Sequence, residues 1–482
     1  MRPEHAKDPS ACCCCRRDLL RAAGAVAGSV ALTRTALSAG EGGEPAPAAK
    51  KTKPLVRGAF VYPPSEKLRG RWWSWPGNDF DAEGRQKRYT AGLKAIERKL
   101  DMRIVMDPEP LYTKGGAAKF IDEVNRSKPD GLLLIPFHNR TFGPVDQILA
   151  GTKGAIPAVI FSCLGVKHGS VKGYQRTGVY FIQSLDDLAA IEYGMRMIRT
   201  RRLMRESRII SVAGSGAPRE AAVPFWGTKV RVVPLKRFAE EVRRTEVTDA
   251  VKALAADFVK HARKKLEPTD AAVLAAAKVH FAIRRILAAE HGDAVMMDCL
   301  RRGEMMPCMS FMTLRDQGIA AGCENDLYPT LTLMLLQHLF DRPGFQHNPC
   351  FDTEANHYFA SHCTSASRLF GTGKPQEPHL LRSFAHTNDP TCVPQVLWRP
   401  GEAVTLARLL PGKTPGMLVY TGNVVKSYPM PPVGGCRTNV AVTINELQDV
   451  CDVRGHHNVL IYGDYGRHLH RFCRLYGLAA RT

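Results

Sequence analysis

This chain of 482 residues lacks several features that mark familiar protein classes. Its longest early apolar run, residues 22–32, is too short to cross a bilayer, and no other segment qualifies, so we expect no stable membrane span. Of its 14 cysteines, four stand together at residues 12–15, and the others form no C-x-x-C pair, which argues against a zinc ribbon or a redox motif. No internal repeat or coiled-coil pattern is present, which excludes solenoids and long fibrous helices.

The size and charge of the chain narrow the remaining classes. A chain of this length exceeds one hydrophobic core and predicts two or three domains. The formal net charge is +21, but the basic residues are spread along the sequence. Their densest run, residues 196–208, lies on or just after one predicted helix, which is typical of a solvated basic face. We therefore expect that the protein does not bind nucleic acid, although its net positive charge leaves nucleic-acid binding as a minor alternative.

The first residues predict an export signal. Arg16 and Arg17 precede the short apolar segment 22–32, and small residues suited to cleavage follow at residues 36–39. A paired arginine before such a segment resembles a twin-arginine signal, so residues 1–39 predict a periplasmic or exported protein. Residues 40–54 then read as a linker rich in Pro, Ala and Lys. The alternative is a disordered basic tail on a cytoplasmic protein, because cysteines replace the usual Ser or Thr before the arginine pair.

Residues 55–185 predict a first α/β domain. Short continuous apolar runs at residues 59–62, 103–106, 131–135 and 158–161 alternate with amphipathic helical patterns. Strands that are apolar on both faces and separated by helices are typical of a parallel sheet covered on both sides.

Residues 186–365 predict a second α/β domain. Strand patterns at residues 208–213, 293–299 and 318–323 are separated by long helical patterns. The last of these strands ends on Glu324. Function in open α/β sheets gathers at the carboxyl ends of the strands, where this glutamate falls.

The last domain, residues 366–482, changes character. Short strand patterns at residues 403–407, 417–420, 439–444 and 458–462 are separated by Gly/Pro turns, which indicates an antiparallel barrel or sandwich. The predicted fold class is therefore α/β, with two Rossmann-like or flavodoxin-like parallel-sheet domains followed by a C-terminal antiparallel β-barrel-like domain.

Carboxylates and histidines near strand ends predict a metal site. Glu324 follows a strand, Asp352 lies in an acidic loop, His362 ends the next strand pattern, and His456 and His457 precede another. Hard divalent ions prefer carboxylate oxygens together with an occasional imidazole, and strand ends hold such donors rigidly. The chain therefore reads as a metalloenzyme.

Four segments resemble, in order, motifs of the L-fucose/L-arabinose isomerase superfamily: residues 318–326, 352–363, 435–437 and 455–464. The similarity extends from about residue 55 to the end and is strongest from Asp298 onward. The resemblance implies interconversion of aldoses and ketoses through an enediol with a divalent ion, most often Mn²⁺. It also implies a small sugar as substrate and a homo-oligomer, a trimer or a hexamer.

The resemblance also implies roles for individual residues. Glu324 matches the first metal-binding glutamate, which doubles as acid/base, and His362 matches a histidine ligand. His457, or its neighbour His456, matches the C-terminal histidine ligand. One of these two neighbours should face the site and the other outward, because adjacent strand residues alternate faces. The structural alternatives are that His362 is a hydrogen-bonded core residue and that Glu324 is a charge at a helix N-terminus.

The second carboxylate of the family has no direct counterpart. The loop where it is expected reads Phe-Gln-His-Asn-Pro, so Asn348 stands near its place, and Asp352 is the predicted substitute as metal ligand and catalytic carboxylate. Asn348, His456 and Arg437 are candidates to contact substrate, although Arg437 fits a structural ion pair equally well. The unmatched carboxylate leaves a second function open: an exported, catalytically impaired sugar-binding or sensory protein with the isomerase fold.

Overall fold

The structure is a computed structural model that describes residues 51–68, 80–152, 156–167, 169–300, 302–412 and 415–482. The predicted export signal, residues 1–39, and most of the predicted linker lie outside the described residues. The described residues form one unit by their internal contacts. None of the described helices combines the length and the apolar character that a membrane span needs.

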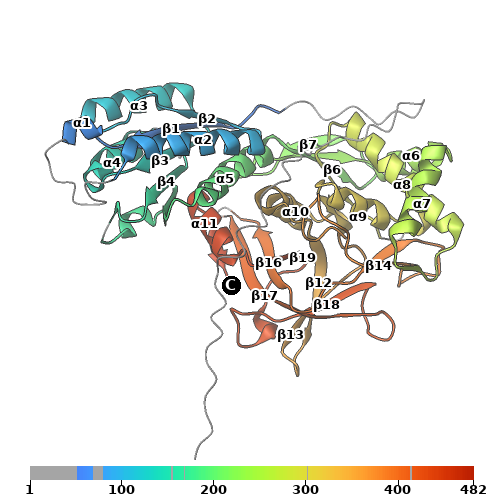
Figure 1. The fold of residues 1–482 in the computed structure, drawn as a ribbon. Coiled ribbons are helices and arrows are strands. Elements are labelled where there is room, and N and C mark those ends of the chain that lie inside the picture. The colour runs from blue at the N-terminus through green and yellow to red at the C-terminus, as the bar shows by residue number, and fades with distance from the viewer. Residues whose placement is uncertain (1–50, 69–79, 153–155, 168, 301, 413–414) are drawn as a thin grey trace, which may run out of the picture. The chain divides into compact units, whose positions relative to one another are not determined.

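The first sheet is parallel throughout, with the strand order β2-β1-β3-β4-β5 (Figure 1). This is the doubly wound order of flavodoxin-like sheets, so the predicted first parallel-sheet domain is confirmed. Its strands are β1 (Leu55–Val61), β2 (Arg103–Met106), β3 (Gly131–Pro136), β4 (Ala158–Cys163) and β5 (Val179–Ser184). Every residue of β3 and β4 is buried, as expected for central strands covered on both faces.

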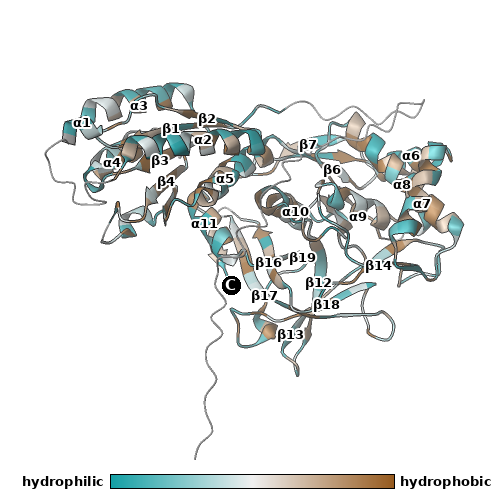
Figure 2. Ribbon diagram, viewed as in Figure 1, coloured by the Kyte–Doolittle hydropathy of each residue, from teal (hydrophilic) through white to brown (hydrophobic). Residues whose placement is uncertain are grey.

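Four helices cover this sheet, two on each face. Their bounds are α2 (Ala82–Leu100), α3 (Lys114–Ser127), α4 (Phe142–Gly151) and α5 (Leu188–Glu206). Apolar residues of α2 and α5 pack into one core cluster with one face of the sheet, and those of α3 and α4 into another. Hydrophilic residues predominate along the visible sides of α2 and α3 (Figure 2). The short helix α1 (Ser65–Leu68) follows β1.

The second sheet has the order β11-β10-β6-β8-β7, in which only the edge strand β7 runs antiparallel. Its strands are β6 (Arg208–Val212), β7 (Arg219–Ala222), β8 (Lys229–Val233), β10 (Ala294–Met297) and β11 (Ala321–Gly322). It is less regular than the predicted second Rossmann-like domain, since β11 has only two residues. The associated helices are α6 (Leu235–Arg244), α7 (Asp249–His261), α8 (Asp270–Ala289), α9 (Cys308–Asp316) and α10 (Leu327–Phe340).

The C-terminal part contains a closed antiparallel barrel of six strands, which confirms the predicted barrel (Figure 1). Its order is β16-β19-β12-β13-β18-β17, and pairing of β16 with β17 closes it. The strands are β12 (Phe345–Asp352), β13 (His357–His362), β16 (Ala403–Leu410), β17 (Gly416–Tyr428), β18 (Thr438–Val442) and β19 (Asn458–Tyr462). Because β12 and β13 precede residue 365, the barrel begins before the predicted domain boundary.

The remaining elements attach to the two sheets and the barrel. A small sheet joins β9 (Lys264–Lys265), β14 (His379–Arg382) and β15 (Val393–Val396). The last helix, α11 (Gly466–Tyr476), follows β19, and β20 (Ala479–Arg481) then pairs in parallel with β17. Most cysteines of the described residues are buried and all are free, as expected for small core residues.

Candidate metal centre

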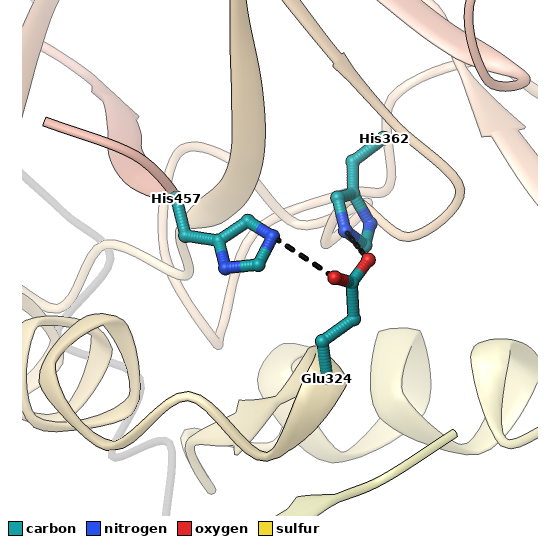
Figure 3. A group of neighbouring side chains, drawn as sticks. All are labelled: Glu324, His362 and His457. Atoms are coloured by element: carbon teal, nitrogen blue, oxygen red, sulfur yellow. Dashed lines mark hydrogen bonds and ion pairs between the residues drawn. The ribbon is translucent and has the colours of Figure 1, made fainter. Parts of the chain in front are cut away.

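Three side chains from distant parts of the sequence converge on one position (Figure 3). Glu324 follows β11 in the short turn Cys323–Asn325, His362 ends β13, and His457 directly precedes β19. One donor atom from each lies within 4.8 Å of the others. His362 Nε2 is 3.2 Å from Glu324 Oε1, and His457 Nε2 is 3.4 Å from Glu324 Oε2. Both histidines are almost fully buried, whereas the Glu324 side chain is 26% exposed and can be reached from solvent.

The backbone that carries these donors adopts unusual conformations. Glu324, Asn325 and His457 have φ values of 56°, 53° and 55°, in the left-handed region that non-glycine residues seldom occupy. Such conformations cost free energy and persist only where surrounding contacts hold them, most often at functional sites. Here the Gln346 side chain on β12 supplies two of those contacts. Its Oε1 accepts from the Cys323 amide at 2.9 Å, and its Nε2 donates to the Cys323 carbonyl at 3.1 Å.

A buried arginine ties the two strand ends together. Arg315 on α9 donates from Nε and Nη2 to the carbonyl of Ala321, the first residue of β11, at 2.9 and 2.6 Å. Its Nη1 donates to the carbonyl of Thr364, two residues after His362, at 2.7 Å. A single guanidinium therefore fixes the backbone on both sides of the site, using the planar fork that lysine lacks.

A second carboxylate orients His457. Asp326 Oδ2 lies 3.0 Å from His457 Nδ1, and Arg408 approaches the same carboxylate at 3.7 Å and donates to the His457 carbonyl at 3.1 Å. A carboxylate on Nδ1 favours the tautomer with its proton there, which directs the Nε2 lone pair outward. That buried Nε2 has no hydrogen-bond partner among the described residues and faces a Glu324 oxygen. Two acceptors that face each other in this way suit a cation between them.

The electrostatics of the group favour positive charge at this position. The adjacent imidazoles of His362 and His457 hold the pKa of Glu324 well below its usual range. Burial opposes protonation of His457, but the neighbouring carboxylates of Asp326 and Glu324 outweigh burial and raise its pKa. Burial likewise opposes protonation of His362, while the neighbouring sulfur atoms of Cys363 and Cys323 raise its pKa. The carboxylate is therefore ionised at neutral pH.

This buried Glu/His/His group can hold a metal ion. Two imidazoles and one carboxylate are donors that divalent first-row transition metals accept. Three protein ligands leave coordination positions open, which is characteristic of catalytic rather than structural sites.

We expect the affinity for a divalent ion to fall steeply as the pH is lowered. Ligation requires neutral imidazoles, and the raised pKa values of His362 and His457 mean that protons still compete above the ordinary histidine pKa. Where both imidazoles are protonated, the affinity should fall by about 100-fold for each pH unit, because each of the two protons displaced contributes a factor of about ten. Calorimetric Mn²⁺ titrations from about pH 5.5 to about pH 8, the range in which histidine titrates, measure this slope. A constant affinity across that range would contradict histidine ligation.

Asp352 lies outside the group, which contradicts its predicted role as a metal ligand. It ends β12 at the hairpin turn, is exposed, and accepts a hydrogen bond from the Ala355 amide at 3.0 Å. Its partner across the hairpin is His357, five residues before His362 on β13. At the rise of an antiparallel strand this separation is about 17 Å. The hairpin therefore carries Asp352 to the end of the strands opposite the site.

The candidate substrate residues differ in position. His456 is exposed and its ring lies beside that of the buried His457, with ring centroids 4.2 Å apart. Neither residue lies in a strand, since β19 begins at Asn458, so the predicted alternation of strand faces does not apply to them. Arg437 donates to the carbonyls of Ser383 and Met430 at 2.6 and 2.7 Å, a structural role in which no described residue forms an ion pair with it. Asn348 pairs with the residue before His362 across the β12–β13 ladder, and its buried Oδ1 has no hydrogen-bond partner among the described residues.

The sequence did not identify Asp326, Gln346 or Arg315 as parts of the site. Asp326 precedes α10, where an aspartate commonly caps a helix, but its side chain makes no capping hydrogen bond and turns to His457 instead. The Glu-Asn-Asp spacing at a strand end was the available signal. Gln346 and Arg315 act on backbone groups brought close only by folding, and no local pattern reveals them.

Comparison with models of known protein families finds no match to this sequence, and comparison with curated proteins finds none either.

Proposed function

We propose that this protein is a metal-dependent sugar isomerase of the fucose/arabinose isomerase type, which interconverts an aldose and a ketose through an enediol. The convergence of Glu324, His362 and His457 is the observation that supports the proposal. These are the residues that resemble the family's ligands, and they come from positions separated by 38 and 95 residues of chain. Mn²⁺ is the proposed ion. The proposal includes a second Rossmann-like domain around β6, β8 and β10, and a homo-oligomer.

The proposed chemistry assigns distinct tasks to the residues of the site. A bound divalent ion supplies a Lewis acid and a template for two adjacent sugar oxygens. Glu324 is ionised at neutral pH and partly exposed, so it can accept and return the proton that moves between C1 and C2. Asp326 holds the His457 imidazole in one tautomer, and the buried histidine rings shield one side of the carboxylate from water.

A specific observation favours a second candidate, an exported sugar-binding or sensory protein that keeps the fold and has lost the catalysis. Asp352 lies away from the site, and among the described residues Glu324 is the carboxylate that joins the two histidines. A single carboxylate suffices to bind an ion but leaves proton transfer at the second carbon without an assigned base.

One experiment separates the two candidates. The purified full chain is stripped with a chelator, reloaded with Mn²⁺ and incubated with a panel of pentoses and hexoses, and the products are identified by chromatography. An isomerase converts at least one aldose to its ketose only when loaded. The Asp352→Asn variant should retain this activity, because the residue lies in an exposed hairpin. Sugar binding by calorimetry without conversion would establish the sugar-binding alternative instead.

A further inference from the structure

A cavity of about 430 Å³ lies between β5 and α11. Three arginines of α11, Arg467, Arg471 and Arg474, line one side. Tyr174 and Tyr180, together with polar residues of β5 and the turn before it, line the other side. Neither the metal site nor the proposed isomerase chemistry uses any of these residues.

The three arginines form one face of the helix. Their spacing of four and three residues places them one above another on α11. Arg471 donates to the Tyr180 hydroxyl at 3.2 Å, and its guanidinium lies 5.4 Å from the centre of the Tyr180 ring, so both contacts hold it against the cavity wall. Arg467 and Arg474 are exposed, and none of the three has an ion-pair partner within the described ranges. Positive charge thus gathers along this side of the cavity.

The wall opposite the arginines adds little negative charge. Asp187 is the one carboxylate among the lining residues, and it caps α5 by accepting a hydrogen bond from the Ala189 amide at 3.0 Å. Ala190 also lines the cavity, so the positive N-terminal end of a 19-residue helix lies beside it. Three guanidinium groups against one carboxylate leave two positive charges, which match a phosphate dianion.

The size of the cavity indicates more than a free anion. Its volume falls in the range of sites for small organic ligands and exceeds what one phosphate fills. The side-chain amides of Gln175 and Gln183 and the Tyr180 hydroxyl offer hydrogen bonds suited to sugar hydroxyls. Arginine is the residue best suited to a bidentate grip on phosphate.

We propose that this cavity binds a small phosphate ester, with Arg467, Arg471 and Arg474 on the phosphate and the tyrosine and glutamine side chains on its sugar portion. The site is separate from the metal centre. His457 precedes β19 and α11 follows it, so the two lie at opposite ends of a strand of five residues, about 17 Å long. Binding here requires neither metal nor turnover, and its failure would leave the isomerase proposal untouched.

The test is calorimetry on the metal-free full chain with three probes: glucose 6-phosphate, inorganic phosphate and glucose. We expect the sugar phosphate to bind with a Kd below about 1 mM, inorganic phosphate at least about tenfold more weakly, and glucose not measurably. The double variant Arg467→Ala/Arg474→Ala should bind the sugar phosphate at least about tenfold more weakly, because two charge-assisted contacts are lost. The matched control, Arg103→Ala/Arg219→Ala, removes two exposed arginines that do not line the cavity and should leave the affinity unchanged.

Three outcomes would overturn the proposal. Absence of binding for every probe would dismiss the site. Equal affinity for inorganic phosphate and the sugar phosphate would show a simple anion site. Equal weakening in both double variants would show that net charge alone attracts the probe.

Discussion

Replacing Glu324 with glutamine is expected to abolish stoichiometric binding of a divalent ion. The substitution keeps the size of the side chain but removes the one negative charge that faces both His362 and His457. Loss of an outer partner of a metal ligand weakens binding by about 10- to 100-fold, so loss of the charged ligand itself should exceed about 100-fold. Elemental analysis of the purified variant and Mn²⁺ calorimetry measure the effect.

The matched control for this prediction is Asp352→Asn. It is the same carboxylate-to-amide change, in a residue that the sequence proposed as a ligand and that lies in an exposed turn. The affinity of the Asp352→Asn variant for Mn²⁺ should stay within about twofold of that of the unaltered protein, as expected for a surface substitution. If Glu324→Gln keeps one equivalent of tightly bound ion, or if Asp352→Asn loses it, the assigned donor set is wrong.

Replacing Arg315 with methionine is expected to lower the free energy of unfolding by about 3–5 kcal/mol, since the carbonyls of Ala321 and Thr364 each lose a buried charged donor. Methionine fills most of the volume, so the loss reflects the missing hydrogen bonds rather than a large cavity. Metal affinity should fall as well, because Arg315 fixes the backbone beside both Glu324 and His362. Urea denaturation and Mn²⁺ calorimetry on the folded variant report the two effects separately.

Arg199→Met provides the comparison. Arg199 on α5 also donates to a backbone carbonyl, that of Leu100 at 2.7 Å, but it is only half-buried and belongs to a helix that covers the first sheet. For Arg199→Met we expect the free energy of unfolding to fall by about 1 kcal/mol and the metal affinity to stay unchanged. Similar unfolding free energies for the two variants, or unaltered metal binding in folded Arg315→Met, would show that Arg315 does not hold the site together.

Much of the architecture followed from local patterns. Continuous apolar strands such as β3 and β4, flanked by helices with apolar residues three and four apart, predicted a parallel sheet covered on both faces, because strand and helix periodicities are local properties. Short strands between glycine and proline turns likewise predicted the antiparallel barrel. The boundary at residue 365 misplaced β12 and β13, because the strands with which they pair lie as far along the chain as β18 and β19.

The sequence by itself determined the residue types of the site: a glutamate after a strand and histidines next to two later strands, Glu324, His362 and His457. Only the tertiary structure decided which donors meet. Asp352 lies ten residues from His362 in the chain, yet the hairpin sends it to the far end of β12. His457 lies 95 residues beyond His362 and is brought in by the pairing of β19 with β12. Distance along the chain and distance in space differ here because antiparallel pairing decides which strand ends meet. The β12–β13 hairpin places Asp352 and His362 at opposite ends of its strands, whereas pairing of β19 with β12 places His457 beside the site.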